Sequence, residues 1–132
     1  MVVMKGYVAD IEKLTLENNN FRKVLYTGKN LQLVLMTIQS SDDIGEEVHE
    51  EHDQFFRVEE GKGEVFIEGV TTRIKADDVV IVPAGAVHNV INTGTEPLRL
   101  YTIYSPPEHR YNVIHATKAD ASEEHFDGKT SE

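Results

Sequence analysis

The sequence contains no cysteine, no long apolar run and comparatively few basic residues. Without cysteine, the chain can have no disulfide, no thiolate nucleophile and no cysteine-ligated zinc or iron–sulfur centre. No apolar run approaches the roughly 20 residues that are needed to span a bilayer. Residues 1–10 also lack the apolar core of a signal peptide, so we expect a cytoplasmic protein with no membrane partner.

The shortage of positive charge bears on possible partners. Lys and Arg number 13 against 23 Asp and Glu, which gives a formal net charge of -10 at pH 7. A chain with this balance repels phosphate backbones, so nucleic acid is not an expected partner. Basic side chains are also not grouped into a recognisable phosphate-binding cluster.

Strand signals dominate the sequence. Apolar and polar residues alternate in segments that recur about every 8–12 residues with turn signals between them, a pattern typical of β-sandwiches and barrels. Residues 31–38 are apolar on both faces in their second half, which predicts a central strand covered on both sides. No segment before residue 105 has helical periodicity, whereas Thr117 to Asp120 resembles a capping box that could start a short helix to about His125.

One stretch in the second half of the chain has a distinctive order of residues. Residues 79–82 form a β-branched apolar run that predicts a buried strand, and Pro83 and Gly85 predict a tight turn after it. His88 and Asn92 then fall on one face of the next strand, because side chains alternate with period two. Burying a histidine costs free energy unless the side chain has a partner. A metal can therefore be proposed here only if a second cluster of polar residues is present.

That second cluster lies upstream, between Gly45 and Gly63. Together the two clusters resemble the motifs of the cupin superfamily, roughly G-x5-H-x-H-x3,4-E-x6-G and G-x5-P-x-G-x2-H-x3-N. The second motif matches well, with Asp77 at its first Gly position. In the first motif, counting back from Gly61 places Gln54 at the usual Glu position and His49 at the second His.

The same register places Glu47 at the first His position of that motif and Ser41 at its opening Gly. The resemblance covers about residues 30–105 and implies an all-β fold of the double-stranded β-helix (jelly-roll) type. We expect residues 1–29 to form N-terminal strands, residues 30–105 the cupin barrel, and residues 106–132 a C-terminal tail or short helix on its surface.

The resemblance also implies a divalent metal inside the barrel. Strand alternation turns the expected ligands inward, where they converge near one mouth of a small barrel. These metal-site candidates are Glu47, His49, Gln54 and His88. Two imidazoles and a carboxylate around open positions are typical of non-haem Fe(II), but the same set suits Zn, Mn, Ni or Co.

Other readings of these residues stay open. Gln54 could orient His49 through a hydrogen bond instead of binding the metal itself. Glu47 could be a solvated charge at the end of a strand. His52 and Asp53 would replace ligands if the register slipped. His109, His115 and His125 are interpreted as surface residues, because none has paired ligand spacing.

The fold alone does not settle the function. One hypothesis is a metal-dependent enzyme that acts on a small-molecule substrate, of isomerase type like the mannose-6-phosphate-isomerase-like cupins or of dioxygenase type. The other is a non-catalytic module that binds a small-molecule ligand. We also expect a homodimer, because the apolar faces of residues 24–26 and 31–38 exceed what one barrel face needs.

Overall fold

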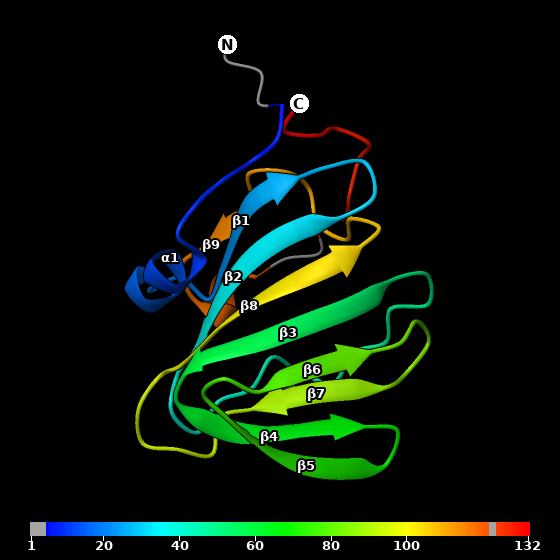
Figure 1. Cartoon of the computed structure of the whole chain (residues 1–132). Coiled ribbons are helices and arrows are strands. Elements are labelled where there is room, and N and C mark those ends of the chain that lie inside the picture. The colour runs from blue at the N-terminus through cyan, green and yellow to red at the C-terminus, as the bar shows by residue number, and fades with distance from the viewer. Residues whose placement is uncertain (1–4, 122–123) are drawn as a thin grey trace.

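The computed structural model describes residues 5–121 and 124–132 (Figure 1). Two antiparallel sheets lie face to face, one with six strands in the order β6-β3-β8-β2-β1-β9 and one with three in the order β5-β4-β7. The strands are β1 (Arg22–Thr27), β2 (Gln32–Ile38), β3 (Asp53–Glu60), β4 (Lys62–Ile67), β5 (Val70–Lys75), β6 (Val79–Val82), β7 (His88–Ile91), β8 (Leu98–Ser105) and β9 (Ile114–His115). The predicted all-β, double-stranded β-helix fold is confirmed.

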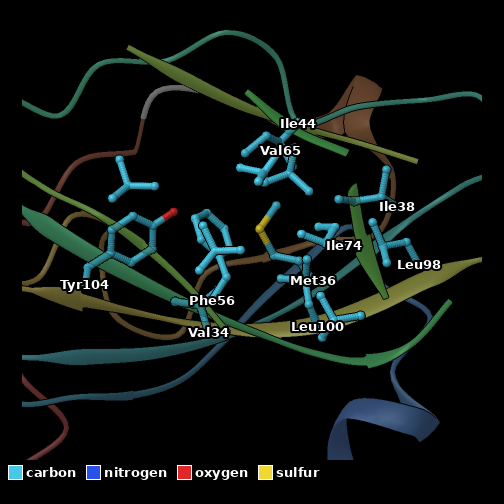
Figure 2. Close-up of a cluster of buried hydrophobic side chains, with 14 of the residues drawn as sticks. Val34, Met36, Ile38, Ile44, Phe56, Val65, Ile74, Leu98, Leu100 and Tyr104 are labelled. Carbon is cyan, nitrogen blue, oxygen red and sulfur yellow. The ribbon is translucent and has the colours of Figure 1, made fainter. Parts of the chain in front are cut away.

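The core lies between the two sheets, as Figure 2 shows. Side chains from both sheets fill it, including Met36, Phe56, Val65 and Leu100, which are all at most 3 % exposed. Tyr104 lies at one end of this cluster, and Leu98 lies at the other. Burial of these side chains supplies the main stabilisation of the fold, at about 25 cal/mol per Å² of apolar surface removed from water.

A helix in the N-terminal part corrects the expectation that no helix precedes residue 105. Helix α1 (Ile11–Glu17) starts at Asp10, whose side chain accepts a hydrogen bond from the backbone N–H of Lys13. The helix packs against β2, β3 and β8 on the outer face of the larger sheet. Its seven residues are too few for a clear periodicity, and a helix this short depends on tertiary packing. Among the described residues, no helix has the length and apolar character of a membrane span.

One of two strands whose burial was predicted differs from expectation. Strand β2 lies between β1 and β8 and is buried along most of both faces, as predicted for a central strand. Strand β6 is instead an edge strand with alternating burial, in which Val79 and Ile81 are 50 % and 65 % exposed. The reading of residues 79–82 as a fully buried strand was therefore wrong for one face, because an unbroken apolar run does not reveal an edge position.

The structure weakens the argument that exposed apolar faces require a homodimer. Val24 and Tyr26 are buried, and so is most of β2, within a single chain. Most of the apolar surface that suggested a dimer is thus covered by the chain itself, whereas Leu31 is 48 % exposed. The homodimer stays a prediction, which light scattering at micromolar concentration can test.

The C-terminal segment, residues 106–132, is not a free tail. Strand β9 pairs with β1, and Lys118 forms ion pairs with Asp42 and Asp43. The backbone N–H of Ser131 donates to the carbonyl of Thr27. The expected helix is shorter than predicted: the capping box of Thr117 and Asp120 is present, but it opens only the single turn η1 (Lys118–Asp120).

Two positions where the cupin motifs carry Gly have left-handed backbone in this chain. The φ of Ser41 is 65° and that of Asp77 is 77°. This conformation costs an L-residue with a side chain roughly 1–2 kcal/mol. The motif glycines are thus explained by the backbone, and the chain keeps the conformation without them.

We predict that Ser41→Gly raises the free energy of unfolding by roughly 0.5 kcal/mol. The relief of left-handed strain exceeds the roughly 0.5–1 kcal/mol of extra chain entropy that glycine loses on folding. Urea unfolding would measure the change. Ser40→Gly is the matched control and should destabilise, because Ser40 lacks positive φ and its hydroxyl donates to the carbonyl of Gly94 at 2.7 Å. Equal destabilisation by both substitutions would contradict the explanation.

Candidate metal centre

Glu47 and His88 face the same side of the barrel because their backbones pair directly. The N–H of Glu47 donates to the carbonyl of His88 at 2.8 Å, and the N–H of His88 donates to the carbonyl of Glu47 at 2.9 Å. Residues opposite each other in an antiparallel bridge carry their side chains on the same face. The segment around Glu47 forms this isolated bridge instead of the expected strand.

His49 joins them through the turn that precedes β7. Its carbonyl accepts the N–H of Gly85, whose φ of 83° confirms the predicted use of glycine in that turn. The ring of His49 lies 5.4 Å from that of His88, measured between centroids, and its Nε2 is 2.9 Å from Oε2 of Glu47. One potential ligand atom from each of these three residues lies within 4.8 Å of the others.

The tautomer of His88 leaves a lone pair directed away from the backbone. Nδ1 lies 3.0 Å from the carbonyl oxygen of Ala86, and a carbonyl can only accept, so Nδ1 carries the proton. The Nε2 atom is completely buried and has no hydrogen-bond partner among the described residues. Metal-binding histidines are commonly held in this way, with the second nitrogen donating to a carbonyl.

Gln54 lies on β3 opposite Tyr104 of β8, the residue whose ring packs against His49. Nε2 of Gln54 donates to Oγ1 of Thr102 at 3.0 Å, so the amide oxygen is not used in this hydrogen bond. That oxygen is buried and has no partner within the described part of the chain. Gln54 thus offers a buried neutral oxygen, and its role as a metal ligand stays a prediction.

The electrostatics of His49 are set by two carboxylates. Burial acts to lower the pKa of this histidine, but the hydrogen bond and charge of Glu47, together with the charge of Glu108, outweigh it. The pKa of His49 therefore lies above its ordinary value of 6.5. A divalent cation would replace the proton between His49 and Glu47 and gain the same negative charge.

These residues fit a divalent metal. Unpaired buried polar atoms are rare in folded proteins, because each loses its water without compensation. The lone pair of His88 is one such atom, and it lies in one cluster with a carboxylate and a second imidazole. The amide oxygen of Gln54 is another buried atom without a partner among the described residues. Oxygen and imidazole nitrogen donors suit Fe, Mn, Co, Ni and Zn alike.

Comparison with known proteins decides the family. The sequence profile of the cupin domain matches residues 34–104. This chain is a member of the cupin family. The uncharacterized protein YrkC of Bacillus subtilis (strain 168) is 45 % identical to it over 123 residues, which cover 89 % of this chain and 66 % of YrkC. The cupin described here thus spans about two thirds of the length of that relative.

Solved structures agree. The crystal structure of BH2720 from Bacillus halodurans superposes with a TM-score of 0.87 at 44 % identity, over 88 % of this cupin and 92 % of that chain. An uncharacterized conserved protein with a double-stranded β-helix domain from Klebsiella pneumoniae gives a TM-score of 0.67 at 23 % identity, over 77 % of this cupin and 91 % of that chain. The second match supports the fold alone.

A tyrosine and a histidine that the sequence analysis did not select lie against the candidate ligands. The ring of Tyr104 packs edge-on to His49 at 5.6 Å between centroids, and its hydroxyl lies 3.2 Å from Nε2 of His109. Burial lowers the pKa of His109 to about 2, so this imidazole is neutral and its Nε2 can accept the phenolic proton. Burial also raises the pKa of Tyr104 well above its ordinary value, which keeps the phenol protonated.

The burial of His109 corrects one reading from the sequence. His109 and His115 are 9 % and 5 % exposed, so the interpretation of both as surface residues was wrong. His115 is buried where β9 pairs with β1, and His109 is buried against Gln32 and Tyr104. Local sequence carries no signal of this packing. The side chain of His125 is 68 % exposed, as expected of a surface residue.

Glu108 connects the C-terminal segment to the site. Its carboxylate lies 2.8 Å from Nε2 of His52, 3.3 Å from Nδ1 of His125 and 3.7 Å from Nδ1 of His49. The alternative ligands named from the sequence have other partners: His52 faces Glu108, and Asp53 accepts the backbone N–H of Ala84. Neither belongs to the cluster of Glu47, His49 and His88.

Glu47, His49 and Glu108 line one cavity of about 460 Å³. The segment from Ile44 to His49 forms one part of its wall, the start of β1 a second, and the C-terminal segment the rest. A small molecule in this cavity would contact Glu47 and His49 on one side and His109 and Arg22 on others. The cavity therefore gives a ligand access to the candidate metal centre.

Proposed function

We propose that this cupin is a divalent-metal-dependent enzyme that acts on a small molecule held in the cavity next to Glu47, His49 and His88. The observation that supports the proposal most is the buried lone pair of His88, which has no protein partner in the described chain and faces a second imidazole and a carboxylate. Two histidines and one carboxylate with open positions favour oxidative chemistry of the non-haem iron type over isomerisation.

Each side chain has a definite part in this proposal. Glu47, His49 and His88 would hold the metal, and the amide oxygen of Gln54 could add a fourth, neutral donor. The metal would supply Lewis acidity and, if it is iron, redox chemistry. Glu47 provides the single negative charge, and the hydrogen bond from His88 to Ala86 fixes the orientation of its ring.

Tyr104 and His109 hold the wall behind His49 rather than exchange protons with a bound molecule. The phenolic proton of Tyr104 is donated to Nε2 of His109, and Tyr104 is only 1 % exposed. Because burial lowers the pKa of His109 to about 2 and raises that of Tyr104, neither group acts as a general acid or base near neutral pH. The chemistry of the proposed enzyme therefore rests on the metal.

Elemental analysis of protein purified without chelators tests this proposal, combined with an oxygen-electrode screen of iron-loaded protein against small polar substrates. We expect about one redox-active metal per chain and substrate-dependent oxygen uptake. Zinc in the purified protein would overturn the oxidative reading, because zinc has no redox chemistry. Absence of any metal would favour the non-catalytic binding module instead.

A further inference from the structure

Arg22 is a buried cation without a carboxylate partner. It opens β1 and is only 5 % exposed, yet none of the carboxylates in the described residues lies within ion-pair distance of its guanidinium. Its one side-chain hydrogen bond there runs from Nη1 to Nδ1 of His115 at 3.2 Å. The guanidinium also lies 5.2 Å from the ring centroid of Phe21, and its Nε has no hydrogen-bond partner.

Such an arrangement leaves most of the guanidinium unused. The group carries five N–H donors in a planar fork, and an unpaired charge is expensive to bury. One neutral imidazole and one aromatic face compensate only part of that cost. A buried Arg in this state is incomplete without an anion.

The other charged groups around the cavity are already paired. Glu108 contacts His52 and His125, and Glu124 pairs with Arg110 at 2.8 Å. Lys118 pairs with Asp42 and Asp43. Within the described part of the cavity wall, Arg22 is thus the cation without a carboxylate partner, whereas Lys118 has two.

Arg22 and the candidate metal ligands face the same space. Arg22, Glu47 and His49 all line the cavity of about 460 Å³. The positive charge of Arg22 also acts, after the larger effect of burial, to disfavour protonation of His109. A molecule that fills the cavity therefore meets a metal centre at one part of its wall and a free guanidinium at another.

We infer that Arg22 binds the carboxylate group of a small-molecule ligand. The planar guanidinium fork matches a carboxylate in a bidentate pair, which adds both energy and orientation. A monoanion fits better than a polyphosphate, because Glu47, Glu108 and Glu124 line the same cavity. The substrate class is then a small organic carboxylate whose other end reaches the metal. This last step rests on the proposed function, whereas carboxylate binding to Arg22 does not.

Nuclear magnetic resonance of ¹⁵N-labelled protein can test the inference through the Nε–Hε signal of Arg22. The probes are sodium lactate and benzoate, each compared with its uncharged amide, and inorganic phosphate as the rival anion. We expect at least one carboxylate to shift the Arg22 signal in the metal-free protein, and neither amide to do so. Amides that act as strongly as carboxylates, or no shift with either carboxylate, would overturn the inference. A shift with phosphate alone would overturn the substrate class.

Variants separate this inference from the metal proposal. Arg22→Lys keeps the charge but loses the fork, and should weaken carboxylate binding at least about tenfold with unchanged metal content. His88→Ala should lose metal but keep the carboxylate response of Arg22. Arg73→Lys, at an exposed position of β5, is the matched control and should change neither property. If Arg22→Lys does not fold, the carboxylate–amide comparison in the unaltered protein still decides.

Discussion

His88→Ala is expected to abolish stoichiometric metal binding, with affinity for a divalent metal reduced by more than about 100-fold. The substitution removes the lone pair of Nε2, which lies with the ligand atoms of Glu47 and His49 in one cluster. Residues that merely support a ligand usually change metal affinity by about 10–100-fold, so loss of a direct ligand should exceed that range. Mass spectrometry of metal content after equal exposure to metal measures the effect.

His125→Ala is the matched control for this experiment. His125 contacts Glu108 but lies largely exposed at the rim of the cavity, so metal content should stay at the level of the unaltered protein. Circular dichroism should show that both variants keep the β-sheet fold. Normal metal content in a folded His88→Ala variant would refute the metal centre and favour a binding module.

The metal content of a Gln54→Ala variant tests whether Gln54 is a metal ligand. If the amide oxygen ligates, metal content should fall as far as in His88→Ala. If Gln54 only fixes neighbouring groups through its hydrogen bond to Thr102, the loss should be intermediate. An unchanged metal content would remove Gln54 from the centre altogether.

The parts of the site that follow from local chemistry were predictable from sequence. The turn at Pro83 and Gly85 and the alternation after it turn His88 and Asn92 inward, and both are at most 1 % exposed. Asn92 holds the sheet through hydrogen bonds to the carbonyls of Ile38 and Glu96. Period-two alternation also placed Glu47 and His49 on one face, although a single bridge to β7 holds that segment.

The parts that depend on non-local packing were not predictable. Arg22 reads in sequence as the first residue of an ordinary strand, and His109 as part of a polar tail. Both are buried because the C-terminal segment folds back over the sheet. Strand β9 pairs with β1, about 90 residues away in the chain, and His109 contacts Gln32 and Tyr104. No local pattern specifies which distant segment covers a barrel mouth, so the cavity and its unpaired Arg22 emerge only from the structure.

Gly63→Ala should be the most destabilising small substitution in the second sheet, at roughly 3 kcal/mol. Gly63 lies in β4 where this strand passes β7, and a Cβ at this position would collide with the carbonyl oxygen of Ile91. The same Cβ would lie 3.2 Å from Cδ2 of Leu98, which is fully buried. A backbone oxygen within a sheet cannot rotate away, so the strands must separate, and overpacking of this kind typically costs 1–3 kcal/mol or more.

Thermal unfolding followed by circular dichroism would measure a fall in Tm of about 10 °C, given a few degrees per kcal/mol for a domain of this size. Gly28→Ala is the control: its nearest neighbour would lie at 3.4 Å and its φ is not positive, so Tm should hardly change. A Tm of Gly63→Ala equal to that of Gly28→Ala would contradict the close approach of β4 and β7. Because β7 also carries His88, saturating metal should raise the Tm of Gly63→Ala less than that of the unaltered protein, since a displaced His88 binds metal more weakly.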